Sequence, residues 1–197
     1  MIERKHAYLI IAHGDFQVLK LLIYALDDVR NDIYLHIDKK VSVYPNLVTK
    51  FSRLIILEYR VDVRWGSYSQ IETELNLFEE AYSQNKHYDY YHLISGTHLP
   101  LKSQDELHQY FADKMGKELI NKMYTDSYEI NFKLGHYHYF LDYYRYGSSI
   151  QRKLAQLCWR ILIKFQYWFR IKKKEPKVTI KANNWVSVTD QAVELLL

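Results

Sequence analysis

The sequence predicts an α/β fold with a mostly parallel central sheet flanked by helices, and three observations lead to this prediction. Short apolar runs typical of buried strands alternate with amphipathic helical patterns over the first 120 residues. The first two strands are separated by one helix, and such a strand–helix–strand unit is expected to be parallel and right-handed. Apolar residues make up 48% of the 197 residues, enough to form the core of a single domain.

The first strand–helix–strand unit follows from short patterns. The run Ala7–Ala12 is apolar throughout, which predicts a strand buried on both faces. Asp15 is expected to be the N-cap of a helix over Phe16–Asp28, where apolar residues recur on one face. A second strand is predicted over Asp32–Asp38. These two strands should therefore be neighbours in the sheet.

The next elements continue the alternation of strands and helices. Asn46–Phe51 is expected to form a short helix or turn, and Leu54–Leu57 a third strand. A strongly amphipathic helix is predicted over Ser69–Asn85. The apolar run Tyr90–Ser95 predicts a fourth strand. All four strands can then lie parallel in one sheet.

The later elements are predicted from the same periodicities, and Ser103 is the expected N-cap of the first of them. They are helices over Gln104–Phe111, Ile150–Ile171 and Asp190–Leu197, and strands over Glu118–Met123, Lys177–Lys181 and Trp185–Thr189. The stretch His136–Tyr146 carries five Tyr and two His. Tyrosines form ordinary cores more often than sites for sugars, so both interpretations of this stretch stay open.

The segment Ile150–Lys174 is both aromatic and basic, and it has two interpretations. One is a peripheral membrane contact, since no acidic residue offsets the positive charge between Arg152 and Lys174. The other is a buried packing helix whose cations extend to water along their apolar stems. Neither is favoured by the sequence alone.

The charge and the cysteine content exclude several classes of protein. A net charge of +4 suits an anionic partner, but the basic residues are not concentrated as in nucleic-acid-binding proteins, so no nucleic-acid partner is expected. A single cysteine, Cys158, excludes an internal disulfide and a cysteine-based zinc site, and it fits a reducing compartment. The chain begins without a secretory signal and has no apolar run that spans a membrane. We therefore expect a cytoplasmic location, either free or at the inner face of the membrane.

Three groups of polar residues follow predicted strands, and ligands of open parallel sheets bind beyond the carboxyl ends of the strands. These groups are His13, the triplet Asp38-Lys39-Lys40, and Ser95–His98. An aspartate at such a position suits a ribose hydroxyl or a base edge, and the two lysines suit phosphate. By itself the triplet is more typical of a solvated loop than of a binding site.

No metal site or cofactor is expected. In metal-dependent enzymes that use sugar nucleotides, an Asp-x-Asp motif usually holds a divalent ion on the diphosphate, and the chain has no such motif. If the chain acts on a nucleotide of this kind, cationic side chains should neutralise the phosphate group that leaves. His136 and His138 have the spacing of metal ligands, but no third ligand has a persuasive spacing. The glycine-rich phosphate motifs and the Gly-x-Ser-x-Gly elbow are also missing, which disfavours kinases, dehydrogenases and α/β-hydrolases.

Five segments carry a resemblance when they are read in order. They are Ala7–His13, Ile33–Lys40, Arg64–Ser69, Tyr91–Ser103 and Asn183–Thr189. In this order and spacing they resemble the core-2/I-branching β-1,6-N-acetylglucosaminyltransferase family, which also includes the peptide-O-xylosyltransferases and many bacterial members. The resemblance implies a GT-A-like, Rossmann-type domain and an inverting, metal-independent glycosyltransferase that uses a UDP-sugar as substrate.

The resemblance also implies two groups of binding residues. The UDP-sugar donor would be bound by Ile11, Ala12, His13, Asp38, Lys39, Lys40, Trp65, Gly66, Ser67, Ser95, Gly96, His98 and Pro100. The acceptor, a glycan or lipid-linked glycan, would be contacted by Trp185 and Asn121. The chain departs from the family at His98, where an Asp or Gln is usual, and at Asn121, where a Glu is usual. These departures imply an acceptor other than mucin-type sugars.

The family's general base is a glutamate some thirty residues after the position of Trp185, so it is expected beyond Leu197. We therefore expect a bacterial member that is incomplete at its C-terminus. Residues 1–125 would form the nucleotide-sugar-binding half, and 126–197 the start of the acceptor-side half. The expected activity is transfer of an N-acetylglucosamine or xylose-like sugar to a glycan hydroxyl in surface polysaccharide synthesis. The alternatives are a catalytically incomplete relative that binds nucleotide sugar or glycan, and a peripheral membrane protein.

Overall fold

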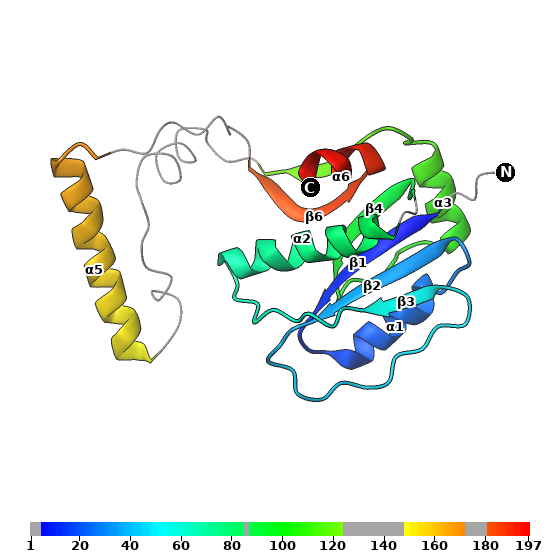
Figure 1. The fold of residues 1–197 in the computed structure, drawn as a ribbon, viewed down its shortest axis with the longest axis horizontal. Helices are drawn as coiled ribbons and strands as arrows, with labels where there is room; N and C mark the ends of the chain where they lie inside the picture. The colour runs from blue at the N-terminus through cyan, green and yellow to red at the C-terminus, as the bar shows by residue number, and fades with distance from the viewer. Residues whose placement is uncertain (1–4, 85–86, 124–147, 172–180) are drawn as a thin grey trace. The chain divides into compact units, whose positions relative to one another are not determined.

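The computed structural model describes residues 5–84, 87–123, 148–171 and 181–197. The chain divides into two compact units, which are described separately (Figure 1). The first contains Met1–Asn121 and Asn183–Leu197, and the second contains Lys122–Ala182. The last fifteen residues thus pack with the N-terminal unit, whereas the sequence grouped them with the second half of the chain.

One mixed sheet forms the core, and its strand order is β3-β2-β1-β4-β6-β5. The strands are β1 (His6–Ala12), β2 (Asn31–Ile37), β3 (Arg53–Ile56), β4 (Tyr90–Ser95), β5 (Leu119–Lys122) and β6 (Ala182–Val188). Strand β1 pairs in parallel with both β2 and β4, and β2 pairs in parallel with β3. Strand β6 is antiparallel to β4. The predicted α/β class with a mostly parallel sheet is therefore confirmed, and it is consistent with the GT-A-like fold.

Helices cover both faces of the sheet (Figure 1). In the first unit they are α1 (Phe16–Leu26), α2 (Tyr68–Ser83), α3 (Gln104–Ala112) and α6 (Asp190–Leu196). Successive side chains of a strand point to opposite faces. Accordingly, Leu9 of β1 packs in the cluster that contains Leu77 of α2, and Ile10 packs in the cluster that contains Leu22 of α1. This explains why β1 is buried along its whole length, as its unbroken apolar run predicts.

Caps and turns differ from the sequence-based expectations at two places. Asp15 precedes α1, but its backbone is left-handed, with φ of 50°, and its side chain does not cap the helix. Asp15 is therefore the N-cap residue, as expected, but it does not cap through its side chain, because a capping side chain normally accompanies an extended backbone at this position. Asn46–Phe51 forms neither a helix nor a turn, and only its last two residues, Lys50 and Phe51, make a bend. At α3 the prediction is confirmed, because Ser103 and Glu106 form a reciprocal capping box.

The C-terminal strand is longer than predicted and begins at Ala182, three residues before Trp185. The other predicted strand, Lys177–Lys181, falls on residues outside the described part except for Lys181, which is not in a strand. The aromatic stretch His136–Tyr146, with His136 and His138, also lies outside the described residues.

Four tyrosines of the first unit belong to the core and not to a sugar site. Tyr34, Tyr88, Tyr90 and Tyr91 are all fully buried. The hydroxyl of Tyr88 donates to Asp32 at 2.7 Å and also lies 2.8 Å from the hydroxyl of Tyr34. These tyrosines therefore form the core with their hydroxyl groups paired, and none of them is available for a sugar.

In the second unit, α5 (Ser149–Trp168) begins with a capping box formed by Ser148 and Gln151. Most of its large apolar side chains are exposed, whereas Trp159, Leu162 and Ile163 are partly buried. The exposed ones, with those that follow the helix, are Ile150, Leu154, Leu157, Ile161, Phe165, Tyr167, Trp168, Phe169 and Ile171. The described part of this unit does not bury them. Among the described helices, none is both long and apolar enough to cross a membrane.

Candidate functional site

A cavity of about 450 Å³ lies at the carboxyl ends of β1, β2 and β4, where the topology of a parallel sheet places ligand sites. It belongs entirely to the first unit. The structure brings together these predicted site residues around it: Ile11, His13, Asp38, Lys40, Trp65, Ser95 and Trp185. Four further lining residues were not predicted: Val41, Val63, Gln70 and Asn184.

Asp38 is the acidic group of the cavity and is only 2% exposed. Its Oδ1 accepts the backbone N–H of Lys40 at 2.8 Å, and its Oδ2 accepts the Lys40 ammonium at 2.9 Å. The same ammonium also donates to Asp62 Oδ1 at 2.8 Å and to the carbonyl of Val63 at 2.6 Å. An ammonium has three N–H groups, so all of them have partners. Lys40 therefore orients Asp38 in this arrangement, instead of standing free for a phosphate.

The charge of Lys40 follows from the same contacts. Burial by itself would lower the pKa of its ammonium, but the hydrogen bonds and negative charges of Asp38 and Asp62 raise the pKa overall. Lys40 is therefore protonated at neutral pH. It compensates two carboxylates at the edge of the cavity.

Two buried or half-buried side chains hold the loop that carries Asp38. Arg60 donates to the carbonyls of Ile37 at 2.8 Å and Asp38 at 2.6 Å, and also to that of Val41. His36 Nε2 accepts the backbone N–H of Val61 at 2.9 Å. Burial lowers the pKa of His36 to about 4, which keeps the ring neutral and able to accept. Sequence reasoning missed Arg60, because nothing local in the sequence links it to a loop some twenty residues earlier.

The loop before α2 places Trp65 at the mouth of the cavity, where the side chain is 76% exposed. Gly66 has a φ of 72°, a left-handed conformation that favours glycine. Ser67 is the N-cap of α2 and accepts the N–H of Ser69. Gly66 and Ser67 do not line the cavity. They therefore shape the turn that presents Trp65 and the turn that starts the helix.

The loop after β4 approaches β1 closely at Gly96. Its N–H donates to the carbonyl of Ile11 at 2.8 Å. A Cβ at position 96 would lie 2.9 Å from the Cβ of Ala12, nearer than such atoms come in proteins. Glycine is therefore required here by packing against a central strand. Gly96 and Ala12 do not line the cavity, and neither do Lys39 and Pro100.

The aromatic end of the cavity is formed by Trp185 of β6. The ring of His98 packs edge-on against it, with centroids 5.2 Å apart, so His98 supports Trp185 from outside the lining. Trp185 also lines a neighbouring hollow of about 470 Å³, and the predicted acceptor residue Asn121 lines this hollow instead. Trp185 is thus the residue shared by both.

Two amides reach the cavity from different elements, Gln70 from α2 and Asn184 from β6. Both donate to Oε1 of Glu74, from Asn184 Nδ2 at 3.2 Å and from Gln70 Nε2 at 3.4 Å. Burial raises the pKa of Glu74 above its ordinary value. The i, i+4 spacing of Gln70 and Glu74 was visible in the sequence, as was the Asn-Asn-Trp motif, but only the folded chain brings the two together.

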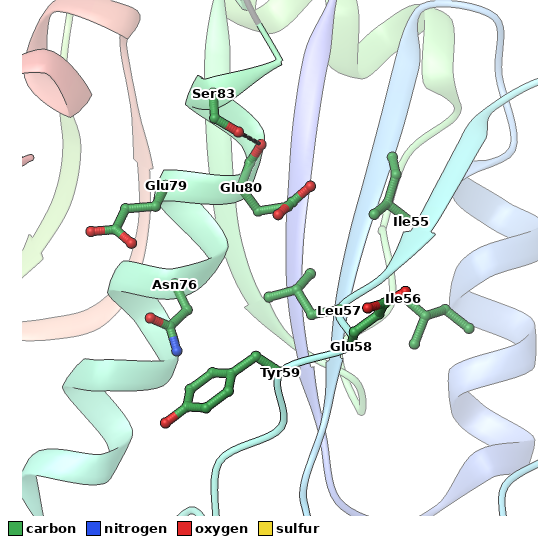
Figure 2. A pocket seen from close by; sticks show the side chains of 9 residues that line it. All are labelled: Ile55, Ile56, Leu57, Glu58, Tyr59, Asn76, Glu79, Glu80 and Ser83. Atoms are coloured by element: carbon green, nitrogen blue, oxygen red, sulfur yellow. Dashed lines mark hydrogen bonds between the residues drawn. The ribbon is translucent and has the colours of Figure 1, made fainter.

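A larger hollow of about 630 Å³ lies between α2 and the end of β3 (Figure 2). Its polar side chains include three carboxylates, from Glu58, Glu79 and Glu80. Asn76 also faces this region, and its buried Nδ2 has no partner in the described part of the chain. None of the predicted site residues lines this hollow. We therefore place the candidate site at the smaller cavity, where aromatic, amide and acidic groups from several elements meet.

Comparisons with known proteins identify the family of the chain. A family model for Core-2/I-Branching enzymes matches residues 6–193. Among curated relatives, an N-acetyllactosaminide beta-1,6-N-acetylglucosaminyl-transferase of Homo sapiens is 25% identical over 118 residues, which is 57% of this chain and 29% of the relative. A beta-1,3-galactosyl-O-glycosyl-glycoprotein beta-1,6-N-acetylglucosaminyltransferase of Bos taurus is 24% identical over 106 residues, 51% of this chain and 25% of the relative. The chain thus aligns with little more than a quarter of these relatives. Because the family model covers nearly all of it, the chain belongs to the Core-2/I-Branching enzyme family.

Proposed function

We propose that this chain forms the donor-binding part of a glycosyltransferase that transfers a sugar, N-acetylglucosamine or a xylose-like one, from a UDP-sugar to a hydroxyl of a glycan or lipid-linked glycan. The observation that carries the proposal is the cavity at the carboxyl ends of the parallel strands, with buried Asp38 and with Trp185 on β6 in its lining. Family membership and the names of the relatives support the same class of reaction.

Two groups in the cavity, Asp38 and Trp185, have a defined part in this proposal. The Asp38 carboxylate accepts hydrogen bonds from ribose hydroxyls or from the base, and its orientation is fixed by Lys40. The Trp185 ring offers an apolar face to a pyranose. The acceptor oxygen then attacks the anomeric carbon in line, UDP leaves with the bonding electrons, and the configuration inverts. The proton of the acceptor hydroxyl goes to a general base, which the resemblance to the family assigns to a glutamate beyond residue 197.

Metal independence is part of the proposal. The Lys40 ammonium lies between the carboxylates of Asp38 and Asp62, at 2.9 and 2.8 Å, and compensates charges that would otherwise favour a divalent cation. The positive charge needed for the leaving diphosphate is proposed to come from side chains, as the resemblance implies.

Thermal unfolding tests both parts of this proposal in one experiment. UDP-N-acetylglucosamine and UDP-xylose are expected to raise the melting temperature, while ADP leaves it unchanged. At 100 times the Kd, a ligand specific for the folded state stabilises it by about 2.7 kcal/mol, a shift of several degrees for a chain of this size. EDTA is expected to leave the shift intact. A shift that appears only with Mn²⁺ would contradict metal independence, and no shift with any UDP-sugar would contradict the donor site.

A second candidate function is peripheral membrane contact through residues 150–174, and the exposed apolar side chains of α5 favour it. It fits an enzyme working at the inner face of the membrane, in the cytoplasm, on lipid-linked acceptors for surface polysaccharide. Flotation with vesicles containing anionic lipid is expected to carry the whole chain upward and to leave a variant lacking residues 150–174 behind. Equal flotation of the two would remove this function.

A relative that binds nucleotide sugar without turnover would behave like the enzyme in the thermal test and differ from it only in activity.

A further inference from the structure

Glu74 lies behind the wall of the cavity and joins two of its lining residues. It is half-buried on α2, one helical turn after Gln70, and it is not itself part of the lining. One oxygen, Oε1, accepts an N–H from Gln70 and another from Asn184 of β6. The contact to Asn184 therefore ties α2 to the strand that also carries Trp185.

The chemistry of these groups decides which way the two amides face. An ionised carboxylate accepts hydrogen bonds but has none to donate, whereas a primary amide has donors on its nitrogen and an acceptor on its oxygen. Each amide must therefore turn its nitrogen toward Glu74. The carbonyl oxygens of Gln70 and Asn184 are then turned away from Glu74, and both residues line the cavity. Two residues of the lining that Trp185 shares thus each have an acceptor oxygen that Glu74 does not engage.

We propose that Glu74 is a positioning residue that makes Gln70 and Asn184 a pair of hydrogen-bond acceptors for the hydroxyl groups of a sugar ring. A pyranose offers hydroxyl donors around its rim and an apolar face, so it matches two carbonyl oxygens beside an indole. This inference rests on the proposed function and deepens it by naming residues that recognise the saccharide. The sugar of the donor and the sugar of the acceptor share this chemistry, and the experiment separates them.

If Glu74 served only to hold the fold together, its replacement would lower stability. A positioning role predicts that stability is kept and saccharide recognition is lost. Burial raises the pKa of Glu74, so holding its negative charge there opposes folding. Replacing Glu74 by glutamine removes the charge and keeps the size, so the folded state should lose no stability. However, the side chain of a glutamine has both a donor and an acceptor, so it no longer dictates the orientation of Gln70 and Asn184. Recognition should suffer while stability does not.

The test compares Glu74→Gln with the wild type by calorimetry. Glu79→Gln is the matched control, because Glu79 lies on the same helix but is exposed and does not line this cavity. The ligands are UDP, UDP-N-acetylglucosamine, and N-acetyllactosamine at saturating UDP. We expect both variants to bind UDP within twofold of the wild type. In Glu74→Gln alone, saccharide binding should weaken about five- to tenfold, as expected when a hydrogen-bond partner is lost.

The ligand that is affected identifies the source of the sugar. A weaker preference for UDP-N-acetylglucosamine over UDP assigns the two amides to the donor sugar, and weaker binding of the disaccharide assigns them to the acceptor. In a Gln70→Ala/Asn184→Ala background, Glu74→Gln should have no further effect on either ligand. Unchanged saccharide affinity in Glu74→Gln, or an equal loss of UDP binding, overturns the inference and leaves the donor site standing. A wild type that binds neither UDP nor a UDP-sugar overturns the proposed function itself.

Discussion

Lowering the pH from 7 to 5 is expected to reduce the free energy of unfolding by about 4 kcal/mol or more, because several histidines are buried in their neutral form. His36 lies in β2, and its pKa is lowered to about 4, with burial as the main cause. Burial and the neighbouring ring of His108 lower the pKa of His6 to about 3. His92 and His108 have lowered pKa values as well, again mainly through burial.

The sign follows from which state binds the protons. In the unfolded chain these rings titrate near 6.5, whereas in the folded state His6 and His36 stay neutral until about pH 3 to 4. Between these values the unfolded state binds more protons, so stability falls as the pH drops below 6.5. Each such ring contributes about 1.4 kcal/mol per pH unit, or about 2 kcal/mol at pH 5. Glu74 works in the opposite direction, since its pKa is raised, but it is a single group.

Urea unfolding at pH 7, 6 and 5 measures this loss. His36→Gln retains an acceptor for the N–H of Val61 and removes the titrating ring, so its stability should fall less steeply with pH than that of the wild type. A free energy of unfolding that stays constant between pH 7 and pH 5 would contradict the prediction.

The parallel part of the fold was predictable because its signals are local. A strand buried on both faces needs an unbroken apolar run, and Ala7–Ala12 is such a run. Asp15 shows the limit of local reasoning, since its place as the N-cap was predictable but its left-handed backbone, without a side-chain cap, was not. The antiparallel direction of β6 was not predictable either, because its pairing with β4 joins Val188 to Tyr91, nearly a hundred residues apart.

The candidate site was predictable in part for a related reason. Residues that follow parallel strands meet at one edge of the sheet by topology alone, and Asp38 and Ser95 lie there as expected. Partners from other elements were not visible. The contacts of Lys40 with Asp62 and Val63, and of Glu74 with Asn184, exist only after the chain has folded. Lys40 was therefore expected to bind phosphate, whereas its ammonium is engaged by two carboxylates and a carbonyl.

Asp38→Ala is expected to weaken UDP binding by about 1–3 kcal/mol, which is roughly five- to 150-fold, because the variant loses a charged acceptor for the ribose or the base. The Asp38 carboxylate is held rigidly by two hydrogen bonds from Lys40, so a ligand gains its contact without first having to order it. Calorimetry with UDP measures the loss. Urea unfolding of the variant shows whether it still folds.

Asp62→Ala distinguishes a direct contact from an effect through Lys40. Asp62 binds the same ammonium at 2.8 Å but does not line the cavity. If Asp38 itself contacts the nucleotide, Asp62→Ala should retain UDP affinity within about threefold, because Lys40 still holds Asp38 through its backbone N–H and its ammonium. Equal losses in the two variants would mean that Asp38 acts only by keeping Lys40 in place. Wild-type affinity in Asp38→Ala would remove this residue from the donor site. The buried Asp38 side chain would then only stabilise its own loop, through its contacts with Lys40.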